Sequence, residues 1–151
     1  YSHNVFGFDS LDVFVYPIRS YNLSDTRGLL KKEFETARRD IDLMYREMGV
    51  LAPTFGDVKQ HKWYAGINGY EVLRLQGEFL DQQQIPYITH AYLSIRGDKF
   101  VKVRATFSKE TDTWPDADKL VQQVMSEISV PEESLFMARM RKRWRDSSVY
   151  E

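Results

Sequence analysis

Acid–base chemistry near neutral pH would depend on the three histidines of this chain, His3, His61 and His90. His90 is out of phase with Ala91 in an alternating segment, which places it on the polar side of an expected strand. It is the best candidate for a general base, and His61 in the aromatic and basic run 61–64 is the second. No two histidines have the i, i+3 or i+4 spacing that presents metal ligands together, so the sequence predicts no metal site.

Motifs for nucleophilic catalysis and for nucleotide binding are missing. The chain has no cysteine and neither a G-x-S-x-G nor an S-x-x-K serine. Its eight glycines form no G-x-G-x-x-G and no G-x-x-x-x-G-K-[ST] phosphate cradle. The sequence therefore predicts no catalytic residue and no cofactor, and it favours a non-enzymatic binding or accessory protein. The alternative is an enzyme whose pocket contains His90 or His61.

A set of polar and aromatic side chains is expected on one face of two neighbouring strands. Partners across a hairpin share a face, and a three-residue loop at 97–99 would pair Ser94 with Lys102 and Tyr92 with Arg104. The other face would then be apolar, through the pairs Ile95–Val101, Leu93–Val103 and Ala91–Ala105. The candidate binding residues, for a protein partner or a small ligand, are Tyr92, Lys102, Arg104 and His90.

Positive charge is concentrated near the C-terminus. Five of the 21 basic residues fall within 139–145, which leaves 16 against 22 acidic residues elsewhere. Arg139, Arg141 and Arg143 on a helix with Trp144 could bind an anionic polymer or membrane surface, although the helix dipole alone favours cations there. The net charge of −1 makes nucleic acid an unexpected partner.

Periodicity predicts the elements that position these residues. Alternation over 11–16 predicts a strand ended by Pro17, and three further strands are predicted at 70–80, 86–96 and 100–108, with another at 58–64. A helix is predicted over 26–48, capped by Ser24 or Asp25 and followed by Gly49. Its apolar stripe is Leu30, Phe34, Ala37, Ile41, Met44 and Met48.

Two helices are predicted after the strands. The first starts at Thr113 and runs to about residue 129, and the second opens near Pro131, with Phe136, Met140 and Trp144 on its core side. The fold class is therefore α+β, an antiparallel meander packed against a long N-terminal helix and C-terminal helices. With 151 residues, we expect a single domain over 1–151, in which 131–146 is an extra helix. The longest uncharged apolar run, 13–18, is too short for a transmembrane segment.

Two pieces of this pattern resemble the PsbP/DcrB-like α/β/α sandwich proteins and uncharacterised bacterial envelope proteins. They are Val13-Phe14-Val15-Tyr16-Pro17-Ile18 before the long helix, and Ala91-Tyr92-Leu93-Ser94-Ile95 with Phe100-Val101-Lys102-Val103-Arg104 before the next helix. The resemblance covers 11–129 and carries no catalytic signature, so no functional residue transfers. It implies helices on both faces of the sheet, an accessory or binding role, and a periplasmic or envelope-associated location with peripheral attachment. A cytoplasmic location is the alternative, because a cysteine-free chain suits both compartments.

Overall fold

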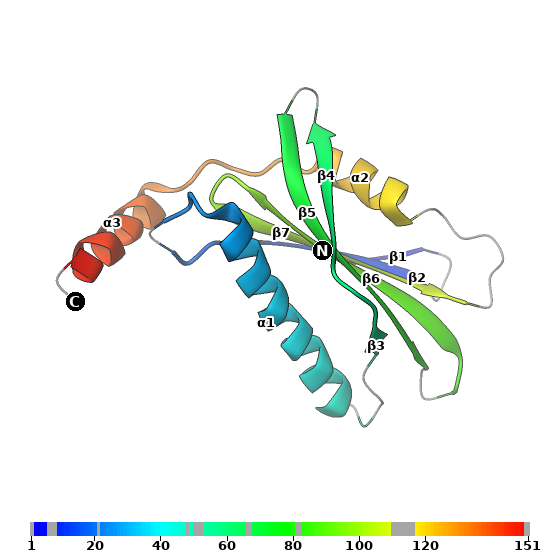
Figure 1. Cartoon of the computed structure of the whole chain (residues 1–151). Coiled ribbons are helices and arrows are strands. Elements are labelled where there is room, and N and C mark those ends of the chain that lie inside the picture. The colour runs from blue at the N-terminus through cyan, green and yellow to red at the C-terminus, as the bar shows by residue number, and fades with distance from the viewer. Residues whose placement is uncertain are drawn as a thin grey trace.

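The computed structural model describes residues 2–5, 9–20, 22–47, 49, 53–65, 68–80, 83–109 and 117–149, which form an antiparallel sheet and three helices (Figure 1). In chain order the elements are β1 (Ser2–Val5), β2 (Asp9–Pro17), α1 (Thr26–Glu47), β3 (Thr54–Phe55), β4 (Lys59–Ala65), β5 (Asn68–Leu80), β6 (Pro86–Arg96), β7 (Lys99–Ser108), α2 (Ala117–Glu127) and α3 (Leu135–Val149). The predicted α+β class is confirmed.

The strands of the described residues form one sheet in the order β1-β2-β7-β6-β5-β3, and β4 also pairs with β5. The predicted meander is confirmed, since β5, β6 and β7 pair antiparallel in sequence. The first predicted strand lies beside the last one, because β2 pairs with β7 from Ser10 to Pro17, its final residue. Proline is tolerated there because the ladder ends at that residue.

Helix α1 begins and ends where the sequence predicts. The carboxylate of Asp25 accepts a hydrogen bond of 3.0 Å from the backbone N–H of Gly28, which satisfies one of the free donors of the first turn. Gly49 follows the helix with φ +72° and donates its N–H to the carbonyl of Arg46 at 3.0 Å. That left-handed conformation costs little for glycine, so the helix stops here.

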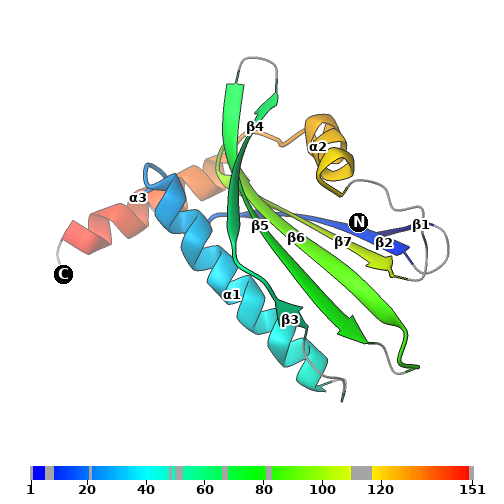
Figure 2. The ribbon, with the colours of Figure 1, turned by 45° about the vertical axis from the view of Figure 1, so that its right-hand side comes forward.

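Both faces of the sheet are buried, each under its own helix (Figures 1 and 2). Side chains of α1 pack on one face in a cluster that consists of Ile18, Leu30, Phe34, Leu73, Leu75, Ala91, Leu93 and Phe100. Side chains of α2 pack on the other face in a cluster that consists of Trp63, Val72, Tyr92, Val101, Val103, Ala105, Phe107, Ala117, Val121 and Met125. Neighbouring residues of one strand therefore enter different cores, and Tyr92 and Leu93 both have an exposed fraction of 0%.

The predicted three-residue loop between β6 and β7 is wrong. The register pairs Arg96 with Lys99, so the turn contains only Gly97 and Asp98. Leu93 consequently faces Lys102, where the prediction paired it with Val103. The predicted pairing assumed that the hairpin has one apolar and one polar face. Each face of the hairpin is instead covered by a helix and contains apolar residues.

The two C-terminal helices also differ in detail from prediction. Helix α2 buries Ala117, Val121 and Met125, and the predicted start at Thr113 lies outside the described residues. Helix α3 begins at Leu135, not near Pro131, and Phe136 is 69% exposed although it was expected in the core.

Candidate functional site

The four predicted binding residues lie on opposite faces of the sheet. In the observed register Tyr92 pairs with Val103 and His90 with Ala105, so these two side chains face α2. Lys102 and Arg104 pair with Leu93 and Ala91 and face α1. The prediction of a single surface that contains all four residues is therefore wrong, for the same reason as the loop.

Tyr92 and His90 belong to a buried polar network under α2. The Tyr92 hydroxyl donates to Asp118 Oδ1 at 2.6 Å, and Arg74 Nη1 lies 3.3 Å from the other oxygen of that carboxylate. Arg74 Nη2 lies 3.4 Å from His90 Nδ1 and 3.1 Å from Gln76 Oε1. Because a guanidinium can only donate, His90 Nδ1 accepts this hydrogen bond and carries no proton. The arrangement ties β5, β6 and α2 together.

The two histidines of the enzyme alternative are packed against aromatic rings. His61 stacks on Trp63 at a centroid distance of 6.1 Å, and His90 lies 6.4 Å from the Tyr92 ring. Neither lines any of the five principal cavities formed by the described residues. Within the same residues no three His, Asp or Glu side chains gather as metal ligands would.

A cavity of about 420 Å³ lies between α1 and the β2–β7 side of the sheet. We call it the α1 groove; its lining residues are Asp12, Phe14, Phe34, Ala37, Asp40, Ile41, Met44, Ala91, Lys102 and Arg104. Helix α1 packs mainly on β6 and β5, and the groove lies where β7 and β2 continue the same face of the sheet. The exposed fractions of Phe14 and Met44 are 45% and 41%, so apolar surface faces solvent here.

Strand β7 forms the floor of the α1 groove and contributes two cationic side chains, one held by hydrogen bonds and one in contact with aromatic rings. Arg104 is held in place, since Nε donates to Thr89 Oγ1 at 3.1 Å and Nη2 donates to the hydroxyl of Tyr45 at 2.7 Å. Lys102 Nζ lies 4.8 Å from the centroid of the Phe14 ring and 6.0 Å from that of Tyr16. It forms no ion pair with a carboxylate of the described residues. Lys102 is therefore a partly covered cation held by aromatic faces alone.

A hydrogen bond joins β2 to α1. The Tyr16 hydroxyl donates to Glu33 Oε1 at 2.7 Å. Burial raises the pKa of Tyr16 above its usual value, and the hydrogen bond to Glu33 and the negative charges of Glu33 and Asp40 raise it further. Tyr16 is thus a neutral donor that fixes the distance between strand and helix.

Sequence analysis identified two residues of this groove as binding candidates and missed the others. It assigned Phe34, Ala37, Ile41 and Met44 to the core, as the helical period suggests. Phe14 had a usable signal, because it is a large apolar residue on the strand face opposite to Val13 and Val15. That alternation did not show how far the helix would cover the sheet.

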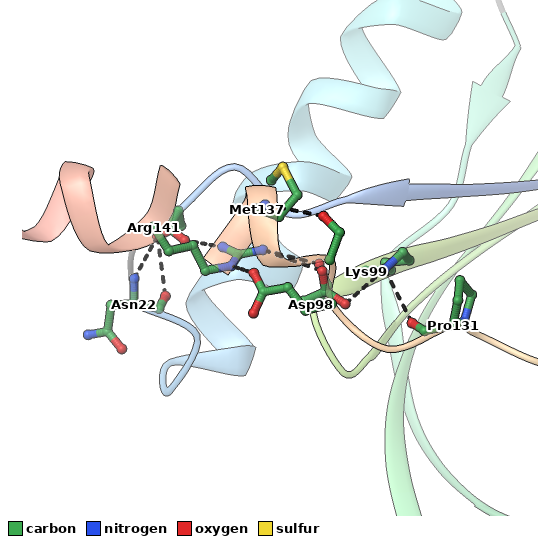
Figure 3. Close-up of polar contacts among 9 residues, drawn as sticks. Asn22, Asp98, Lys99, Pro131, Met137 and Arg141 are labelled. Carbon is green, nitrogen blue, oxygen red and sulfur yellow. Dashed lines mark hydrogen bonds and ion pairs between the residues drawn. The ribbon is translucent and has the colours of Figure 1, made fainter. Parts of the chain in front are cut away.

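The three C-terminal arginines proposed for an anionic partner also separate. Arg139 and Arg143 are exposed, whereas Arg141 is 7% exposed and points into the molecule. Arg141 donates to a carboxylate oxygen of Glu133 and to the backbone carbonyl of Ser20. Its Nη2 lies 3.4 Å from the carbonyl of Asp98 and 3.9 Å from the Asp98 carboxylate (Figure 3). Arg141 is therefore unavailable to an external anion.

The same contacts decide the role of the tripeptide 96–98, which has the letters of an integrin-recognition motif. The carboxylate of Asp98 is buried, where it accepts from Lys99 Nζ at 3.0 Å and faces Arg141 (Figure 3). Glycine fits the turn because Gly97 has φ +60°. These residues form a turn that attaches α3, not a display loop.

No helix of the described residues has both the length and the apolar composition needed to cross a bilayer. Comparisons of the chain with protein-family models, with curated proteins and with solved structures gave no match.

Proposed function

We propose that this chain is a non-enzymatic binding protein of a bacterial cell envelope, and that the α1 groove holds a small amphipathic anion. The ligand class is an aliphatic chain that ends in a carboxylate. The observation that carries the proposal is Lys102, a partly covered cation without a carboxylate partner among the described residues, on the floor of a groove that is lined by apolar as well as charged side chains.

The apolar part of the ligand is accommodated by α1 and β2. Phe14, Ile41 and Met44 offer side-chain surface that water covers only while the groove is empty. Burial of such surface contributes about 25 cal/mol for each Å² removed from water. The volume of about 420 Å³ falls within the range of small-molecule sites, roughly 300–1,000 Å³.

The acidic end of the ligand is placed by the two cations of β7. A carboxylate beside Lys102 would compensate a charge that has left part of its water shell, which is where an ion pair contributes most. Arg104 Nη1 has no partner among the described residues and adds a donor on the same strand face. Asp12 and Asp40 also line the groove and disfavour a ligand with two or more negative charges.

The envelope location and the accessory role are supported by the resemblance to PsbP/DcrB-like proteins. Such proteins have an antiparallel sheet with helices on both faces, and this chain has α1 and α2 in those positions. Fractionation of the cells in which the chain is native tests the location.

Ligand chemistry is tested by calorimetric titration with decanoate, decylamine and decanol below their micellar concentrations. We expect decanoate to bind more tightly than the other two. Stronger binding of decylamine would show that Asp12 and Asp40 dominate, and the absence of binding by all three would reject the proposal.

Two neighbouring residues of α1 provide a matched pair of variants. Met44 lines the groove and Leu43 does not, while both are exposed, at 41% and 56%. Met44→Asp should weaken decanoate binding about tenfold or more, since it replaces apolar contact by a like charge. Leu43→Asp should leave binding within about twofold. Lys102→Met, with Lys59→Met on β4 as its control, should abolish the preference for decanoate over decanol.

A further inference from the structure

Helix α3 is attached to the rest of the molecule in an unusual way. None of its described side chains belongs to either hydrophobic cluster. It projects past the end of the sheet, and Arg141 bonds it to Glu133, Ser20 and the β6–β7 turn (Figures 1 and 3). Among the described residues of α3, Arg141 is the one buried side chain, and it joins the helix to the body.

With Arg141 inward, the helical period determines what points outward. Residues that lie two and five positions before it and two positions after it fall on the opposite face, which are Arg139, Phe136 and Arg143. All three are exposed, Phe136 at 69%. The exposed Asp146 lies five positions after Arg141, at the C-terminal end of this face. Leu135, at 77% exposed, and the exposed Lys142 flank this face. We use the name outer face of α3 for Leu135, Phe136, Arg139, Lys142 and Arg143.

The basic side chains of the outer face have no acidic partner among the described residues. Arg139, Lys142 and Arg143 form no ion pair with a carboxylate of the described residues. The rest of the chain carries 22 acidic and 16 basic residues outside 139–145, so the positive charge is segregated on a protruding element. This geometry brings the basic helix to a surface while the acidic body stays away from it.

The geometry points to peripheral binding of an anionic phospholipid bilayer through the outer face of α3. Leu135 and Phe136 would enter the boundary between headgroups and acyl chains, and the basic residues would lie over the phosphates. The apolar pair distinguishes this partner from a soluble polyanion, which offers no apolar layer for a leucine and a phenylalanine exposed by more than two thirds. The inference does not depend on a ligand in the α1 groove.

The test is co-sedimentation with vesicles of phosphatidylcholine alone and of phosphatidylcholine with about 30% phosphatidylglycerol, at low and high salt. We expect binding only to the anionic vesicles, and loss of that binding at high salt. Each basic residue near such a surface contributes roughly a fivefold factor. Arg139→Glu with Arg143→Glu should therefore weaken binding at least about 25-fold. Equal binding to the neutral vesicles would overturn the inference.

Two further variants separate a bilayer from other anions. Leu135→Ser with Phe136→Ser should weaken vesicle binding severalfold and leave binding to heparin unchanged. A protein that binds heparin and loses no vesicle affinity on this change recognises polyanions, and the inference fails. The control is Lys31→Glu with Arg39→Glu on the exposed side of α1, which makes the same charge change elsewhere. An equal loss in this control would show attraction by net charge alone and would also overturn the assignment to α3.

Discussion

Replacement of Arg141 by methionine tests whether one buried guanidinium holds α3 to the body. The change keeps an unbranched apolar stem, removes the guanidinium, and leaves the Asp98 carboxylate without its second cation. Breaking a buried ion pair costs about 3–5 kcal/mol, and the side chains of Arg141 and Asp98 are 8% and 6% exposed. Lys99 Nζ stays 3.0 Å from Asp98, so we expect the lower end, about 3 kcal/mol.

Amide hydrogen exchange locates that loss along the chain. Because α3 shares no hydrophobic cluster with the sheet, we expect it to open on its own. A cost of about 3 kcal/mol corresponds to roughly 100-fold faster exchange of the α3 amides. Amides of β6 should change little. Arg139→Met makes the same substitution one half-turn away on the exposed side, and it should alter exchange of α3 by less than about threefold.

The reasoning about Arg141 would be refuted by either of two results. Unchanged exchange of α3 in Arg141→Met would mean that the helix is held by other contacts. Equal acceleration in β6 and α3 would mean that the helix and the sheet unfold as one unit.

Three further predictions concern the groove, the two cores and the turn. Tyr16→Phe should lower the free energy of unfolding by about 1 kcal/mol near pH 8, and this difference should shrink above about pH 10. The reason is that the pKa of Tyr16 is raised in the folded state, so its contribution is complete below the unfolded pKa and is lost as pH rises. Urea unfolding that shows the same difference at every pH would contradict this prediction. Leu93→Ala and Met125→Ala should each lower the free energy of unfolding by about 2–5 kcal/mol although they lie on opposite faces, whereas Leu135→Ala should stay within about 0.5 kcal/mol. Gly97→Ala should cost roughly 1 kcal/mol in the same assay, since its φ is +60° and no atom lies within 4 Å of the added methyl; an equally stable variant would contradict the strain argument.

The elements of this fold could be predicted because their signals are local. The strand at 86–96 has the predicted bounds, and the helix predicted over 26–48 is observed over Thr26–Glu47, with residue 48 outside the described residues. Asp25 and Gly49 mark the helix limits through contacts within a few residues of themselves. Periodicity and capping need no knowledge of the rest of the chain.

The register between β6 and β7 could not be predicted in the same way. To predict which residues pair across a hairpin from the pattern of apolar residues, one must know which faces of the strands are buried. That burial depends on helices that are distant in the sequence. Lys102 lies opposite Leu93 and lines the α1 groove, so a lysine and a buried leucine share one face. An error of one residue moved Lys102 and Arg104 to the wrong face relative to Tyr92.

Most of the candidate site and the role of Arg141 could not be predicted from the sequence for a related reason. The stripe on α1 shows which side faces the sheet, and it does not show that Ile41 and Met44 pass beyond the covered strands. Arg141 looks like its neighbours Arg139 and Arg143 in the sequence. It differs only because Ser20 and Asp98, which are 121 and 43 residues away, meet it in space.

The tight turn between β6 and β7 has a consequence for any shortened version of this chain. Asp98 in this turn faces the guanidinium of Arg141, which comes from the last helix of the chain. Without residues 135–149, the Asp98 carboxylate would keep Lys99 and the Asp98 carbonyl would keep the N–H of Ile18, but both would lose Arg141. Trimming the C-terminus would thus alter a turn that lies far from residue 149 in the sequence.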